Sequence, residues 1–310
     1  MPGAIPASSS LNNRFDQNYS RDNPSTGDVY FVGKHIATSA DSENYGRQPD
    51  NPFRTIDYAI GRCTANNGDV IYVLPGHAEA IGIANGIDLD VGGVKIIGLG
   101  QGTGRPTITL DTVVGASIRI NADNVWLENV LILGGIDNIT TSLSINGRVD
   151  VTLKNIEYRD STGQCAIFLA ASNNSDRLTI DGLRYIGDSA AGTTRALQLD
   201  GCDDFTLRNF AIYGNFSTSA INFVTTLSAR VRIIDGQIWT ENSADLCILD
   251  TITGSTGICG PNLFLVLEDN AANITEAITG ATFYVMDPVY VVNAVNEKAM
   301  LINWTASTDA

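Results

Sequence analysis

The chain has 310 residues, enough for one large domain or two medium ones around a sizeable buried core. With 19 basic and 34 acidic residues its formal net charge is -15, so the protein as a whole repels phosphate backbones and anionic lipid surfaces. This charge argues against nucleic-acid binding and against binding to a membrane surface.

The first residues lack the basic segment and the apolar core of a secretion signal. No apolar run approaches the roughly 18 residues that span a membrane. We therefore expect the protein to be made in the cytosol and to stay soluble there.

Residues 1–27 are rich in Ser, Asn, Asp and Pro and have little hydrophobic periodicity, which is typical of a flexible or extended arm. Two interpretations stay open. The arm is either a disordered tail or a segment that becomes ordered when it docks on a partner or a neighbouring subunit. In the second case the candidate binding residues are Arg14, Phe15 and Tyr19.

Residues 28–68 are expected to form an entrance strand and a capping helix. The segment DVYFVG predicts the strand, and Asn51 followed by Pro52 resembles a helix N-cap with proline at the first helical position. The apolar residues that follow recur at intervals of 3, 4 and 3, at Phe53, Ile56, Ile60 and Cys63. A short helix with one apolar stripe in front of a repeat array is expected to cover the open core of its first coil.

One nine-residue phrase recurs five times at nearly constant spacing. The copies are VWLENVLIL from Val125, VTLKNIEYR from Val151, LTIDGLRYI from Leu178, FTLRNFAIY from Phe205 and VRIIDGQIW from Val231. Their starts are 26, 27, 27 and 26 residues apart, which is typical of a solenoid in which each copy is part of one coil. Similar segments precede and follow them, so residues 69–269 are expected to form about eight coils.

The entrance segment and the coils together resemble a known fold family. PDNPFRTIDYAI, NNGDVIYVLPGHAEAI and the NVWLENVLI type of coil are similar to the right-handed parallel β-helix of the pectate-lyase-like superfamily, closest to its small members among tailed-phage virion proteins. The resemblance spans roughly residues 28–265 and implies an all-β chain, a single right-handed parallel β-helix with an N-terminal capping helix. This superfamily includes lyases, hydrolases, tailspikes, adhesins and structural subunits, so the fold alone leaves the function open.

Aligned copies place equivalent residues about 4.8 Å apart in neighbouring coils. The first and third positions are apolar and are expected to face the core. The fifth position, where the chain turns between two sheets, holds residue types that tolerate a left-handed backbone and can stack along the axis, namely Asn129, Asn155, Gly182, Asn209 and Asp235.

Charge alternates from coil to coil at two positions of the phrase. The fourth position reads Glu128, Lys154, Asp181 and Arg208, and the residue before each copy reads Asp150, Arg177, Asp204 and Arg230. Neighbours of opposite sign favour this register, while like charges would oppose it. We expect these residues to hold adjacent coils together.

The nearest candidates for catalytic carboxylates are Asp200, Asp203 and Asp204 in LQLDGCDD. They resemble the paired aspartates of the polygalacturonase type, but the GHG and RIK motifs that accompany that pair are missing. Glycoside hydrolysis needs two carboxylates at a set separation, and pectate-lyase chemistry needs an acidic calcium site with a basic residue. Because Asp204 already has charged ladder partners, we expect a structural turn here rather than a catalytic site.

The sequence favours neither a metal site nor a cofactor. The two histidines are His35 and His77, and the cysteines, which are scattered without CxxC spacing, are Cys63, Cys165, Cys202, Cys247 and Cys259. We expect the thiols to be free and buried.

Residues 270–310 depart from the coil pattern and are expected to form a C-terminal cap or an oligomer contact. Three aromatic residues are the candidates for that contact: Tyr284, Tyr290 and Trp304. The resemblance alone implies a homo-oligomer, possibly a trimer, because phage β-helices often trimerise.

These observations favour a non-enzymatic structural protein of a tailed-phage virion, made in the host cytoplasm. Its most favoured role is a capsid decoration or cement protein, with the shell of the major capsid protein as its partner. The alternative is a tailspike or receptor-binding protein that binds or cleaves host surface polysaccharide. A third interpretation, a sugar-binding adhesin, calls for an exposed aromatic row, but outward Trp126 has no aromatic neighbours in its column.

Overall fold

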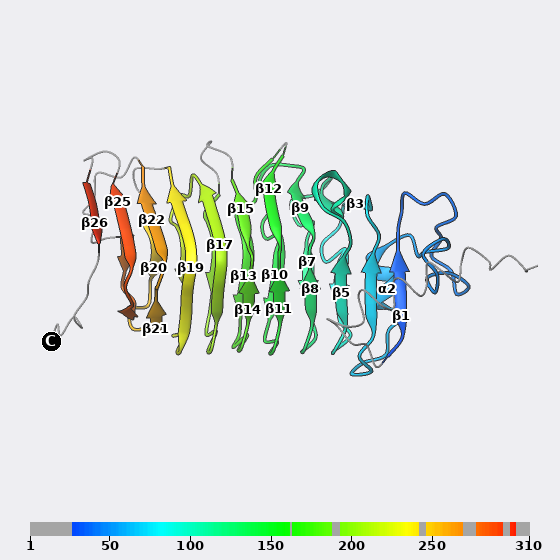
Figure 1. Cartoon of the computed structure of the whole chain (residues 1–310), viewed down its shortest axis with the longest axis horizontal. Helices are drawn as coiled ribbons and strands as arrows, with labels where there is room; N and C mark the ends of the chain where they lie inside the picture. Colours follow the sequence, from blue (N-terminus) through cyan, green and yellow to red (C-terminus); the bar gives the residue numbers. More distant parts are fainter. Residues whose placement is uncertain are drawn as a thin grey trace, which may run out of the picture.

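The structure is a computed structural model that describes residues 27–161, 163–187, 193–241, 246–268, 277–293 and 298–301. Over these residues the chain forms an elongated parallel β-solenoid, with strands stacked side by side along one axis (Figure 1). The prediction of an all-β solenoid is confirmed. The predictions for Arg14, Phe15, Tyr19 and Trp304 concern residues outside the described ones.

The strands of the solenoid lie on three faces, although the first coil contributes only β1. Face I is paired in the order β1 Val29–Val32, β2 Val70–Val73, β5 Lys95–Gly98, β8 Trp126–Glu128, β11 Thr152–Lys154, β14 Thr179–Asp181, β17 Thr206–Gly214, β19 Val231–Thr240, β21 Thr256–Cys259 and β24 Thr282–Val285. The long strands β17 and β19 continue from face I onto face II.

Face II contains, besides the second halves of β17 and β19, the strands β3 Ala78–Ile81, β6 Thr107–Leu110, β9 Leu131–Gly134, β12 Glu157–Asp160, β15 Arg184–Ile186, β22 Leu263–Leu267, β25 Val289–Asn293 and β26 Lys298–Leu301. All of these pairs are parallel except β25 with β26, which is antiparallel. Parallel pairing therefore extends past residue 269, where the sequence pattern fades, as far as Asn293.

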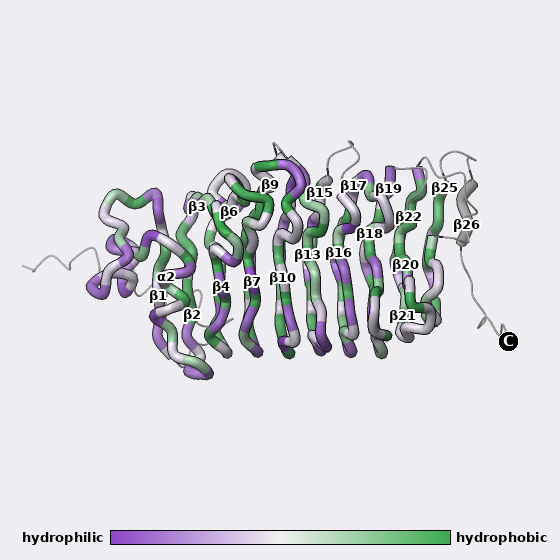
Figure 2. The backbone as a smooth tube through the Cα atoms, turned by 180° about the vertical axis from the view of Figure 1, so that it is seen from behind, coloured by the Kyte–Doolittle hydropathy of each residue, from purple (hydrophilic) through white to green (hydrophobic). Residues whose placement is uncertain are grey.

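Face III is a separate row of eight strands: β4 Ile87–Leu89, β7 Ile118–Ile120, β10 Leu143–Asn146, β13 Ile167–Ser172, β16 Arg195–Leu199, β18 Ser219–Phe223, β20 Leu246–Asp250 and β23 Ile278–Thr279. Figure 2 shows how hydrophobic and hydrophilic stretches alternate along the coils. This alternation follows from the period of two in a strand, which sends successive side chains to opposite sides of the sheet.

A continuous hydrophobic core runs through the solenoid from Tyr30 to Val291. All first- and third-position residues of the phrase are buried in it, as predicted. The eighth position brings two tyrosines into the core, where the rings of Tyr158 and Tyr185 stack with centroids 5.1 Å apart. Phe168 packs against both rings. The core of the central coils is therefore partly aromatic.

The corners between faces I and II are built as the phrase predicts. All five fifth-position residues have φ between 51° and 84°, in the left-handed region that Asn, Asp and Gly tolerate. Asn155 Nδ2 donates to Asn129 Oδ1 at 2.9 Å, and Asn262 Nδ2 donates to Asp235 Oδ1 at 2.8 Å. Side-chain amides thus link coils at the corner.

The helix in the entrance segment starts later than predicted. It is α2, Ile56–Ile60, and its N-cap is Thr55, whose hydroxyl accepts a hydrogen bond from the backbone N–H of Tyr58. Asp41 explains the shift, because one of its carboxylate oxygens accepts the N–H groups of Arg54 and Thr55 in front of the helix. The prediction of Asn51 as N-cap was therefore wrong.

The helix packs at the N-terminal end of the solenoid, against β1, β2 and β4 (Figure 1). Its buried residues are Ile56, Ala59 and Ile60. A short 3-10 helix, η1 Gly102–Gly104, lies in the loop between β5 and β6.

Candidate functional site

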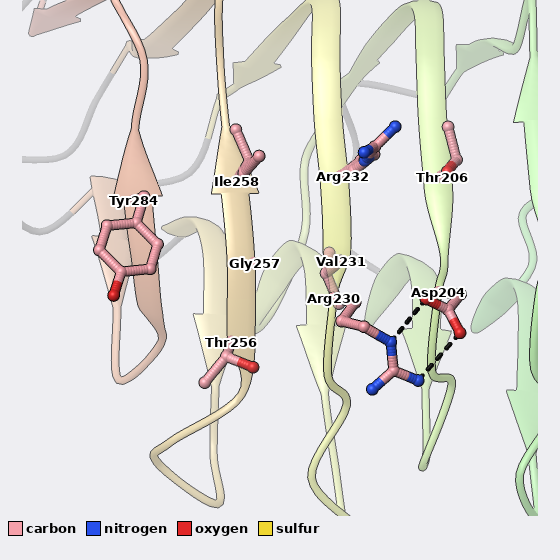
Figure 3. Close-up of a pocket in the computed structure, with 9 residues that line it drawn as sticks. All are labelled: Asp204, Thr206, Arg230, Val231, Arg232, Thr256, Gly257, Ile258 and Tyr284. Carbon is pink, nitrogen blue, oxygen red and sulfur yellow. Dashed lines mark hydrogen bonds and ion pairs between the residues drawn. The ribbon is translucent and has the colours of Figure 1, made fainter.

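The alternating charges before each phrase form two ion pairs at the corner that leads into face I. Arg177 Nε and Nη2 bind Asp150 Oδ1 and Oδ2 at 2.6 and 2.8 Å. Arg230 binds Asp204 in the same two-pronged way, at 2.7 and 2.9 Å (Figure 3). Each arginine therefore joins its own coil to the previous one through a planar, bidentate contact.

These contacts decide what Asp204 can do chemically. The hydrogen bonds from Arg230 lower the pKa of Asp204, and those from Arg177 lower the pKa of Asp150. A general acid must hold a proton near the working pH, which requires a raised carboxyl pKa. Asp204 is held ionised instead, so it is unsuited to that role.

Asp203 also has a structural role, through contacts that the sequence reasoning did not predict. Asp203 Oδ1 accepts the backbone N–H of Ala229 in the next coil at 2.8 Å, and Oδ2 contacts Arg230 Nη2 at 3.1 Å. Asp176 Oδ1 accepts the N–H of Asp203 itself at 3.0 Å. An aspartate two residues before the phrase thus links one coil to the next, and its recurrence at the same offset was the signal in the sequence.

Asp200 stands apart from this pair. It follows β16, its N–H donates to the carbonyl of Ala171, and its Oδ1 is buried without a hydrogen-bond partner. Within the described part of the chain, no hydrogen bond or ion pair connects Asp200 with Asp203 or Asp204. Asp203 and Asp204, in contrast, share Arg230 as a partner.

The fourth-position charges also lie in register between coils. Lys154 Nζ is 3.4 Å from Glu128 Oε1, and Arg208 Nη2 is 2.8 Å from Asp181 Oδ2. Outward Trp126 lies between two lysines of neighbouring coils, with the ammonium groups of Lys95 and Lys154 at 5.8 and 5.6 Å from its ring centroid. The outward side chains of neighbouring coils are therefore linked by ion pairs and by cation–π contacts.

A groove of about 480 Å³ adjoins the Asp204–Arg230 pair on face I. Figure 3 shows Thr206, Arg232, Ile258 and Tyr284 on four neighbouring strands along it. Tyr284 is 69% exposed. Arg232 is also exposed and forms no ion pair with any described residue. The groove thus offers a ring, a guanidinium and threonine hydroxyls, a set suited to binding a small polar ligand.

A second exposed aromatic group lies on face II. The rings of Phe264 and Tyr290 stack with centroids 4.8 Å apart, and Trp239 lies 6.2 Å from Tyr213. Of the predicted contact residues, Tyr284 and Tyr290 are therefore both exposed, but they lie on different faces. Two aromatic pairs between neighbouring coils thus occur here, one at the seventh and one at the ninth position.

His77 is fully buried near the N-terminal end. Its Nδ1 accepts the N–H of Lys34 at 3.1 Å, so Nε2 carries the proton and faces Glu79 Oε2 at 3.2 Å. The same oxygen accepts the N–H of Ile56, the first residue of α2. His77 and Glu79 therefore tie the entrance loop and the helix to β3.

The five cysteines form no disulfide, and all but half-buried Cys63 are buried. Burial raises the pKa of Cys165, Cys202 and Cys259 to about 12, so these thiols stay protonated and unreactive at neutral pH. Among the residues that the structure describes, no cluster of three His, Cys, Asp or Glu side chains could hold a metal ion. Nor does the described chain contain a helix long and apolar enough to cross a membrane.

The paired corner aspartates make stability depend on pH in a definite direction. Because their pKa values are lowered in the folded state, the contribution of Asp150 and Asp204 is complete above the ordinary carboxyl pKa of 3.8 and is lost as the pH falls through the lower folded-state values. We expect the melting temperature to fall below about pH 4, and to fall less steeply in the D150N/D204N double variant. Thermal melts followed by circular dichroism across this range test it; identical slopes would contradict it.

Two solved structures resemble this chain. The chain is similar to a rhamnogalacturonan lyase, with 11% identity over 89% of this chain and 90% of the other and a TM-score of 0.46. It is also similar to the pectate lyase Pel9A, with 11% identity over 84% of this chain and 75% of the other and a TM-score of 0.51. No protein-family model matches the chain, and no curated protein sequence matches it. At this identity the likeness to the pectate lyase shows a shared fold and nothing about activity.

Proposed function

We propose that this protein is a non-enzymatic structural protein of a tailed-phage virion that decorates the outer capsid by binding the shell of the major capsid protein. One observation carries the non-enzymatic part: Asp203 and Asp204 are both bound by Arg230, so these carboxylates are accounted for as links between coils. The resemblance of the coils to small phage proteins supports the virion part. The net charge of -15 is consistent with a soluble particle surface.

In this proposal the solenoid is a rigid body and the polar N-terminal segment is its attachment to the shell. The candidate contacts are Arg14, Phe15 and Tyr19. Self-association as a trimer is part of the proposal, with exposed Tyr284 and Tyr290 as contact residues.

The test is imaging of gold-labelled protein on intact particles by electron microscopy. We expect even labelling of the shell, and loss of labelling when Arg14, Phe15 and Tyr19 are all replaced by alanine. A matched control replaces Arg177 by alanine on the solenoid and should label normally. Labelling confined to the tail tip, or none on the particle, would contradict the decoration role.

A second candidate function is the binding or cleavage of host surface polysaccharide by a tailspike or receptor-binding protein. The face I groove favours it, because an exposed ring beside an unpaired guanidinium suits a sugar ligand. This function predicts tail-tip labelling. Cleavage further predicts that the protein releases reducing sugar from capsule or lipopolysaccharide and that the D203N/D204N variant does not.

A further inference from the structure

Three arginines converge on one buried glutamate on face II, at a distance from the Asp204 corner along the solenoid. Glu157 is 6% exposed. Its Oε2 lies 2.8 Å from Arg105 Nη1, and its Oε1 lies 2.5 Å from Arg159 Nε and 3.9 Å from Arg184 Nη1. We call these four residues the arginine cluster.

The solenoid brings the cluster together from three parts of the chain. Glu157 and Arg159 are two residues apart on β12, so they point to the same side of the sheet. Arg184 is the register partner of Glu157 on β15. Arg105 comes from the loop after η1, 52 residues before Glu157, and also donates to the carbonyl of Asn155.

The charges in the cluster do not balance. Three guanidinium groups against one carboxylate leave an excess of two positive charges, in a chain whose net charge is -15. The corner pairs differ, because Arg177 meets one carboxylate and Arg230 meets two. Burial lowers the pKa of Arg105; the charge of Glu157 opposes this, and those of Arg159 and Arg184 add to it. Like charges are thus crowded together without full compensation.

The cluster also has unused hydrogen-bond donors. The side chains of Arg159 and Arg184 are 47% and 61% exposed, and within the described residues their only carboxylate partner is Glu157. Arg105 Nε is buried without a partner. Both oxygens of Glu157 are already in contact with arginines, and no other described carboxylate forms an ion pair with these three guanidinium groups.

We propose that the arginine cluster is a binding site for a phosphate or sulfate group. The outward N–H groups of Arg159 and Arg184 bind the oxyanion, while Glu157 and Arg105 hold them in position. A guanidinium offers paired donors that match two oxygens of such a group, and a doubly charged oxyanion balances the excess of two positive charges, which a single carboxylate would only halve. This site is independent of the proposed virion role.

The group has two possible sources, the free inorganic ion or a phosphate carried by a saccharide. Isothermal titration of the full chain with inorganic phosphate, sulfate, glucose 6-phosphate and glucose separates them. We expect saturable binding of the phosphates and sulfate and none of glucose. Tighter binding of glucose 6-phosphate than of inorganic phosphate indicates a saccharide-borne group; the reverse order indicates the free ion.

The R159Q/R184Q variant is expected to bind inorganic phosphate at least about a hundredfold more weakly, since it loses two charged hydrogen bonds and each contributes about tenfold or more. The matched control, R177Q/R230Q, removes two exposed arginines elsewhere and should bind as the parent does. If the R159Q/R184Q variant fails to fold, the R184Q variant is measured instead, because there Glu157 still has Arg105 and Arg159 as ion-pair partners. No saturable binding by the parent chain, or equal losses in R184Q and the control, would overturn the proposal.

Discussion

Replacing Asp69 by alanine is expected to lower the free energy of unfolding by about 3 to 5 kcal/mol, because three N–H donors lose a buried carboxylate. Asp69 is completely buried directly before β2. Its Oδ1 accepts the N–H of Asp28 and the side-chain amide of Asn67, each at 2.7 Å, and its Oδ2 accepts the N–H of Thr64 at 2.7 Å.

The position of Asp69 predicts which part of the solenoid opens first when stability is lost. Asp28 directly precedes β1, so the carboxylate ties the first strand of the solenoid to the turn that enters the second. In a repeat array each coil is stabilised by its neighbours, so we expect β1 and α2 to open first. Urea denaturation measures the free energy, and amide hydrogen exchange measures the local opening.

Asp28 provides the matched control. It also forms an ion pair, with Arg47 at 2.8 Å, but both side chains are about half exposed. Replacing Asp28 by alanine should cost less than about 1 kcal/mol, because exposed pairs contribute little. Similar losses in D69A and D28A would mean that the buried carboxylate does not anchor the first coil.

The parts of this structure that the sequence predicts are those whose residues recur at the same position in successive coils. Asn129 and Asn155 were predicted as stacked corner residues because their offset in the phrase recurs, and a recurring offset in a solenoid means a shared place in space. The ladder partners Asp150 and Arg177 were predicted on the same ground. The amino-acid types at these positions then fix the backbone conformation, because Asn and Asp tolerate positive φ.

Contacts between residues that do not occupy the same position of the repeat could not be predicted in this way. Arg105 lies in a loop outside the phrase, so nothing in the spacing links it to Glu157 two coils further along. The N-cap at Thr55 depends on Asp41, which lies in an irregular segment. A periodic sequence pattern predicts the register between neighbouring coils. The path of a loop depends instead on tertiary contacts between residues that do not recur periodically in the sequence.

The arginine cluster and the aromatic group belong to one surface. Face II carries Arg159 and Arg184 on its central strands and Trp239, Phe264 and Tyr290 on its later ones. Face I carries the paired charge ladders, with exposed Arg232 and Tyr284 as its arginine and aromatic side chains in the groove. If the protein docks on a partner through its side, the chemistry of face II is the better suited to it, since aromatic and arginine side chains are enriched at interfaces.

Replacing Tyr158 by alanine is expected to destabilise the protein by about 3 to 5 kcal/mol, as for other large aromatic residues removed from a core. Tyr158 is completely buried and packs against Phe168 and Tyr185, with ring centroids at 5.0 and 5.1 Å. A cavity there would open in the middle of the solenoid, where the coils on both sides depend on it. Urea denaturation of purified protein measures the change.

Two further variants serve as controls. One tests the hydrogen bond of Tyr158, and the other tests aromatic stacking at an exposed site. Tyr158→Phe keeps the ring and removes only the hydroxyl, which donates to Asp160 at 2.7 Å, so a loss of about 1 kcal/mol is expected. Tyr290→Ala removes a stacked but exposed ring and should cost no more than about 1.5 kcal/mol. If Y158A lowers the free energy of unfolding no more than Y290A does, the central aromatic core contributes little to stability. The stability of the solenoid would then depend on the backbone hydrogen bonds between its strands and on the contacts at its corners.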